Sequence, residues 1–105
     1  MGLDMFATYA NDEVEDELAY WRKHYSLDVW MQNLYHLRGG TDTFNCKRVD
    51  LDAEDLEDLE HAILEGILPE GRYEYHDYKE YDLEFIQNAM DKIYQGYKVT
   101  YSNWW

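Results

Sequence analysis

The sequence predicts an α+β fold, with a sheet of about three strands and about four helices packed on one face of it. Two observations carry this prediction. Apolar and polar residues alternate in separated short stretches, which is typical of strands with one buried face, and apolar residues recur at helical spacing between them. The expected order is strand, helix, helix, strand, helix, helix, strand. With no Pro/Gly/Ser-rich linker, residues 1–105 are expected to form a single globular domain.

The first expected strand covers residues 3–9, where Leu3, Met5 and Ala7 alternate with more polar positions. Asn11 and Asp12 follow, and their side chains are suited to an N-cap. Acidic residues are concentrated in the next turns, where the helix dipole favours negative charge. A helix is therefore expected to begin directly after the first strand.

The stretch Glu17–Trp30 carries aromatic, basic and acidic side chains together, and we expect it to be helical. Four residues fall on one face at a period of 3.6: Val14, Leu18, Trp21 and Tyr25. Ser26 is a candidate cap for a second helical segment, with apolar residues at Leu27, Trp30, Met31, Leu34 and Leu37. The two segments form either one kinked helix, which we favour, or a tight helical hairpin, and Gly39-Gly40 ends them.

The remaining elements are expected from similar patterns. Residues 44–51 predict a strand with a bulge near Cys46, and Asp52 is expected to cap a third helix. The buried stripe of that helix consists of Leu56, Leu59, Ile63 and Ile67. Asp82 is expected to cap a fourth helix, and alternation through Tyr97, Val99 and Tyr101 predicts the last strand. The first and last strands are candidate neighbours, although the pattern leaves the strand order open.

Charge and composition restrict the class of protein. The net charge is -14, with 23 acidic and 9 basic residues, which argues against direct binding to nucleic-acid phosphates and suits a partner with a basic surface. The single cysteine, Cys46, excludes an internal disulfide and indicates a reducing compartment. The opening residues lack a signal-peptide pattern, and no apolar run is long enough for a membrane span. We therefore expect a cytoplasmic protein without membrane attachment.

No recognisable motif for a metal, a cofactor or a catalytic nucleophile is present, so we expect none of these. The acidic run that begins at Asp50 resembles a calcium loop only in part, because Asp55 stands where the sharp turn needs glycine and His61 where it needs glutamate. The four histidines do not have the spacing of a zinc site. Gly39-Gly40 lacks the lysine and hydroxyl residue of a phosphate-binding loop.

Two groups of residues are candidate sites. The candidate ligand-binding set places a basic pair beside a histidine and a carboxylate and consists of Tyr20, Arg22, Lys23, His24 and Asp28. It would suit a phosphate or carboxylate ligand, because arginine matches both groups. The alternative is that the basic pair forms ordinary surface ion pairs. The candidate interface set is aromatic and consists of Tyr73, Tyr75, Tyr78, Tyr81, Trp104 and Trp105. Its alternative is a tyrosine belt that packs over a helix and the sheet.

The sequence also resembles a family of small bacteriophage and bacterial proteins. The resemblance rests on the opening MGLDMF, the AYWRK element, the stretch YHDYKEYDLEF and the ending YSNWW, and it spans most of the chain. Family members often have Asn and His at the positions of Tyr25 and Asp28, which alters any site built on that pair. The resemblance implies a viral or host-cytoplasmic setting and no known activity.

The resulting hypothesis is a non-enzymatic, acidic accessory protein of phage type that binds another protein. A stronger version is nucleic-acid mimicry by the acidic stretches at residues 12–17 and 50–60. The alternative is a small-molecule binder or small enzyme that uses Arg22, Lys23, His24 and Asp28. Homodimerisation is a compatible further expectation, motivated by Trp104-Trp105.

Overall fold

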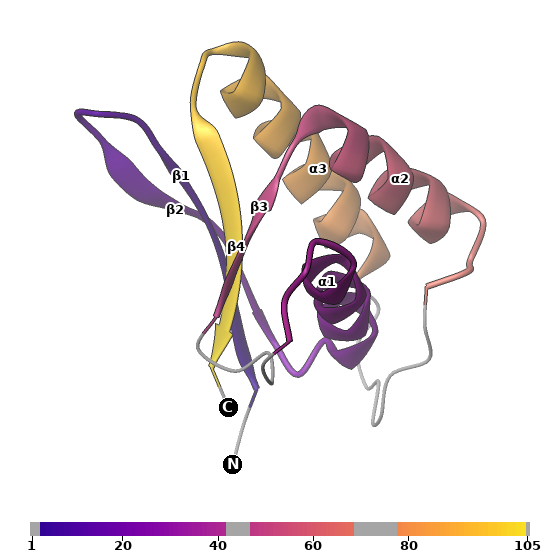
Figure 1. Ribbon diagram of the computed structural model, residues 1–105. Coiled ribbons are helices and arrows are strands. Elements are labelled where there is room, and N and C mark those ends of the chain that lie inside the picture. Colours follow the sequence, from indigo (N-terminus) through magenta and orange to yellow (C-terminus); the bar gives the residue numbers. More distant parts are fainter. Residues whose placement is uncertain (1–2, 42–46, 69–77, 105) are drawn as a thin grey trace.

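The described residues form a four-stranded antiparallel sheet with three helices on one of its faces (Figure 1). The computed structural model describes residues 3–41, 47–68 and 78–104. The elements in chain order are β1 (Asp4–Ala10), β2 (Glu15–Arg22), α1 (Tyr25–Leu37), β3 (Arg48–Leu51), α2 (Ala53–Leu64), α3 (Lys79–Tyr94) and β4 (Lys98–Trp104). The predicted α+β class is confirmed. The predicted numbers of strands and helices and their order are wrong.

The strand order is β2-β1-β4-β3, so the first and last strands of the chain are the two central strands. Met5 of β1 lies opposite Trp21 of β2 on one side and Asn103 of β4 on the other. β3 pairs with β4, where Val49 lies opposite Tyr101. The expectation that the first and last strands are neighbours is confirmed, and β2 and β3 form the two edges.

The stretch that was predicted to form the first helix instead forms β2 and the start of α1, so that prediction is wrong. Asn11 accepts hydrogen bonds from the backbone N–H groups of Glu13 and Val14, and its own N–H donates to the Val14 carbonyl, so this segment closes a turn between two strands. The register of β1 against β2 shifts between Ala7 and Thr8. This bulge interrupts the alternation of β2 and leaves a spacing that resembles a helix.

The hydrophobic core lies between the sheet and the three helices. Each strand directs alternate residues toward the helices, including Met5, Ala7, Ala19, Trp21, Val49, Leu51, Val99 and Tyr101. α3 packs against β2 and β4, α1 packs against β3, and α2 packs against α3. The opposite face of the sheet is not covered by these helices (Figure 1).

The helix boundaries follow local chemistry only in part. Asp52 caps α2 as predicted, since its carboxylate accepts from the Asp55 N–H at 2.8 Å and Asp55 reciprocates at 3.0 Å. Ile67, predicted to be buried, lies beyond the end of α2 and is exposed. α3 begins at Lys79, so Asp82 is not its cap but a buried residue of its first turn.

The strand predicted at residues 44–51 is confirmed for Arg48–Leu51, while Cys46 lies outside the described residues. Within the described ranges, no helix combines the length and the apolar character needed to cross a bilayer.

Candidate functional site

The structure separates the candidate ligand-binding set into an exposed and a buried part. Tyr20 and Arg22 belong to β2 and point away from the helices, because they alternate with the inward residues Ala19 and Trp21. Lys23 follows with a positive φ of 58°, which turns the chain from the sheet edge toward α1. Beyond this turn, His24 and Asp28 are buried. Ligand binding by the set stays a prediction, but its members do not converge on one surface.

His24 belongs to a buried centre around the carboxylate of Asp82. Its Nε2 lies 2.7 Å from Asp82 Oδ2, and the indole N–H of Trp21 donates to Asp82 Oδ1 at 2.8 Å. Tyr78 stacks on the His24 ring with 4.6 Å between ring centroids, and its hydroxyl donates to the Arg22 carbonyl at 2.9 Å. The centre joins the end of β2, the start of α1 and the first turn of α3.

Asp28 forms a second buried centre between α1 and β4. One carboxylate oxygen accepts from the Tyr101 hydroxyl at 2.6 Å and from the Asn103 amide at 2.8 Å, and the other accepts from Gln32 at 2.8 Å. Burial raises the pKa of Tyr101 well above its ordinary value, and the charge and hydrogen bond of Asp28 raise it further. Tyr101 therefore stays a neutral donor across the physiological range.

Both centres connect elements of the fold and are closed to solvent. Asp82 is 2% exposed, Asp28 3% and His24 4%, so their polar atoms face other parts of the protein. In the parts of the chain that the structure describes, no group of three or more His, Cys, Asp or Glu side chains is arranged to hold a metal ion. The carboxylates of Asp28 and Asp82 accept hydrogen bonds from buried donors.

The uncovered face of the sheet carries the exposed part of the candidate set. Tyr20 lies over Phe6 with 5.2 Å between ring centroids and donates its hydroxyl proton to Asp4 at 2.6 Å. This hydrogen bond is the main reason that the pKa of Tyr20 is raised. Asp4 lies between Arg22 and Trp104 in the sheet register, and Trp104 is 61% exposed.

The described members of the candidate interface set have different environments. Tyr78 and Tyr81 pack over the His24 and Trp21 centre, with Tyr81 edge-on to Trp21 at 5.8 Å. The Tyr81 hydroxyl also accepts the backbone N–H of Tyr20 at 3.1 Å on the edge strand β2. Trp104 alone among the described members extends into solvent over most of its surface. Tyr73, Tyr75 and Trp105 lie outside the described residues.

One concave surface lies between α1 and α2. It is a groove of about 380 Å³ lined by Trp30, Asn33, Leu34, Leu37, Asp55 and Asp58. Arg38, the C-cap residue of α1, donates to the Asp50 carbonyl and to the carboxylate of the lining residue Asp55. We call this surface the α1/α2 groove.

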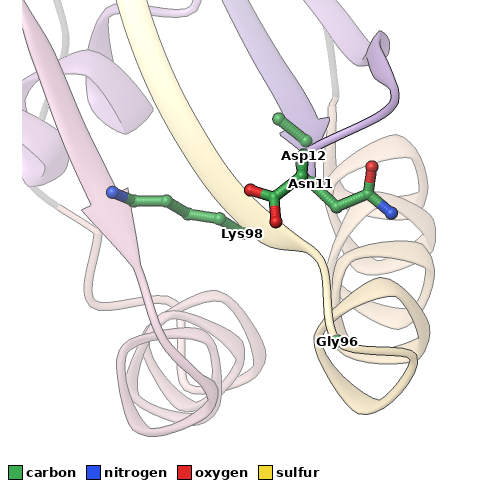
Figure 2. A pocket seen from close by; sticks show the side chains of 5 residues that line it. Asn11, Asp12, Gly96 and Lys98 are labelled. Carbon is green, nitrogen blue, oxygen red and sulfur yellow. The ribbon is translucent and has the colours of Figure 1, made fainter.

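Two other pockets are less suited to a ligand. Figure 2 shows the pocket of about 390 Å³ near Asn11, Asp12, Gly96 and Lys98, at the turn between β1 and β2 and the start of β4. Two of its polar side chains have partners in the fold, because Asn11 closes the β1–β2 turn and Lys98 lies 3.0 Å from Asp50. The third pocket, of about 230 Å³, is lined by residues of β2 and α3, including Leu18, Tyr81 and Asn88.

Two features of the structure were not predicted from the sequence: the burial of Asp82 as a hydrogen-bond acceptor, and the α1/α2 groove. A signal for Asp82 was present, since it shares a helical face with Phe85, Ile86 and Ala89, all of which are buried. The groove gave no such signal, because its two walls come from separate helices.

Comparisons with protein-family models, with curated protein sequences and with solved structures gave no match.

Proposed function

We propose that the protein is a non-enzymatic, acidic binding protein whose partner is another protein with a basic surface. The observation that carries the proposal is a row of exposed carboxylates on α2. Glu54, Asp58 and the C-cap residue Glu65 follow one another at helical spacing, with His61 in the same row, and we call these three acids the α2 acidic row. Within the described ranges, none of the three has an ion-pair partner.

Three acidic residues near the row do form ion pairs with basic side chains. Asp50 lies 3.0 Å from Lys98, and Asp52 and Asp55 pair with Arg38. Unpaired surface carboxylates attract a basic partner and speed its association, and salt weakens this attraction. The proposal includes a cytoplasmic setting, as the phage-type resemblance implies.

The alternative of a small-molecule site around Arg22, Lys23, His24 and Asp28 has less support. Arg22 and Lys23 are exposed, whereas His24 and Asp28 are enclosed by α3 and β4. None of these four residues lines one of the three pockets described above. The arrangement of these residues therefore supports protein binding rather than a small-molecule site.

The test is affinity capture from the cytosol of the native cell at low and high salt, followed by mass spectrometry. A variant with Glu54→Gln, Asp58→Asn and Glu65→Gln removes the α2 acidic row while keeping side-chain size. The matched control, with Glu80→Gln, Glu84→Gln and Asp91→Asn, removes three exposed charges from α3. We expect a partner that is lost at high salt and in the α2 variant but retained by the α3 variant. Equal capture by both variants would refute the proposal.

Self-association through the uncovered sheet face is a second candidate function. This face presents Trp104 beside acidic and basic residues that alternate across the strands, namely Asp4, Arg22, Arg48, Asp50 and Lys98. Two copies related by a two-fold axis can match such charges, and repulsion between chains of net charge -14 is weakest where the charges are mixed. Sedimentation of Trp104→Ala beside the wild type tests it, since a dimer of the wild type should become a monomer in the variant.

A further inference from the structure

We infer that the α1/α2 groove binds a basic amphipathic helix of the partner protein. This inference rests on the proposed function and names the surface and the chemistry of the segment that it receives. The groove combines an apolar floor with an acidic wall, and both parts are needed for the argument.

The floor of the groove consists of apolar side chains of α1. Trp30 and Leu34 are partly buried against the core, while Leu37 at the last turn of the helix is 84% exposed. These residues recur at spacings of four and three, so they form one stripe along α1. Such a stripe is the kind of surface on which the apolar face of a second helix packs.

The wall of the groove determines the charge of the occupant. Arg38 neutralises Asp55, which leaves Asp58 as the carboxylate of the lining without a described ion pair. Asp58 belongs to the α2 acidic row, so further carboxylates continue along α2 on both sides of it. A helix lying on the floor would place Lys or Arg side chains of its polar face beside this row.

The geometry between the two helices allows a helical occupant. α1 packs on β3 and α2 packs on α3, and side chains of both helices line the groove between them. Arg38 holds the end of α1 to the start of α2 through Asp50 and Asp55. The groove is therefore anchored at one end and does not have to form when the partner arrives, which lowers the entropic cost of binding.

The test uses a labelled synthetic peptide of about 18 residues in which Leu recurs at helical spacing and Lys fills the other positions. A control peptide has the same composition in a scrambled order that gives no apolar face. Fluorescence anisotropy at low salt measures the binding of both peptides to the wild type and to two variants. Leu37→Glu alters the groove, and Tyr94→Glu makes the same kind of change at an exposed residue at the end of α3.

We expect the wild type and Tyr94→Glu to bind the amphipathic peptide more tightly than the scrambled one, and Leu37→Glu to lose roughly tenfold or more of its affinity. The added carboxylate would strengthen a purely electrostatic contact with a basic peptide, so weaker binding would identify an apolar contact at Leu37. Equal affinity of Leu37→Glu and the wild type, equal affinity for both peptides, or no binding by the wild type would each overturn the groove inference. None of these three results would refute the proposed function, which depends on the effect of the α2 acidic row on capture of the cellular partner.

Discussion

Nε2 of His24 lies 2.7 Å from the carboxylate of Asp82, although 58 positions separate the two residues in the chain. The contact joins the residue before α1 to the first turn of α3 inside the protein. Because Asp82 also accepts the indole N–H of Trp21, one carboxylate satisfies buried donors from β2 and from the start of α1.

Replacing Asp82 should therefore destabilise the protein strongly. We expect Asp82→Ala to lower the free energy of unfolding by about 3 kcal/mol, since it leaves the buried Trp21 and His24 nitrogens without this acceptor. Urea denaturation at neutral pH measures the change. Glu84→Ala, two residues further along α3 and exposed, is the control and should stay within about 0.5 kcal/mol of the wild type. Similar values for the two variants would show that the buried centre contributes no more than an exposed carboxylate.

Tyr101 should make stability sensitive to alkaline pH. Its pKa in the folded protein lies well above the ordinary value near 10, because the phenol is buried beside Asp28. The folded state therefore keeps a proton that the unfolded chain loses, and stability falls as pH rises from about 10 toward the folded pKa. We expect Tyr101→Phe to flatten this decline, while costing about 1 kcal/mol at neutral pH through the lost hydrogen bond to Asp28. Tyr94→Phe, at an exposed site, should leave the decline unchanged, and an equally steep decline in Tyr101→Phe would contradict the prediction.

Asp52 should contribute stability at neutral pH that is lost in acid. Its pKa is lowered chiefly by the hydrogen bond from the Asp55 backbone N–H, and also by the Asp55 side chain and the charge of Arg38. The unfolded chain therefore takes up the proton first as pH falls below about 4, and the contribution disappears as pH passes through the lower folded pKa. We expect Asp52→Ala to cost about 1 kcal/mol at neutral pH and less at acidic pH. Asp52→Asn keeps a capping oxygen, so a loss as large as that of Asp52→Ala would show that charge, not capping, is responsible.

Arg38 should not be replaceable by lysine. Its guanidinium donates through different nitrogens to the Asp50 carbonyl and to the Asp55 carboxylate, and a lysine ammonium does not have this planar fork. We expect Arg38→Lys to lower the free energy of unfolding by about 1 kcal/mol in urea denaturation and to weaken peptide binding to the α1/α2 groove. The matched exchange Arg48→Lys, at an exposed position of β3, should change neither quantity. Unchanged stability and binding in Arg38→Lys would mean that charge alone suffices at this position.

Much of the fold was predictable where local chemistry and structure coincide. β1, β4 and the capped start of α2 follow from alternation and from Asp52. β2 was not predictable in the same way. The bulge opposite Ala7 and Thr8 displaces Leu18 from the alternation, and Leu18, Trp21 and Tyr25 then have the spacing of a helix. The Asn11 side chain suits a helix cap and a turn equally well, so it did not decide between them.

The candidate site was less predictable because its neighbours are distant in the chain. His24 and Asp28 look exposed when residues 17–30 are drawn as one helix, but the turn at Lys23 directs both inward toward α3 and β4. The partners of these two residues are Asp82, Tyr101 and Asn103, and no local pattern indicates such pairings. The α1/α2 groove likewise exists only once two separate helices have been placed.

The position of β4 between β1 and β3 has a consequence for biosynthesis. Among the described residues, β3 pairs only with β4, and β1 pairs only with the bulged edge strand β2 until β4 is present. The pairing of β1 with β4 therefore cannot form during synthesis until the residues up to Trp104 have left the ribosome. Until then, the apolar faces of β1 and β3 are exposed to chaperones and to other chains, so the interval before release is when this protein is most prone to aggregate.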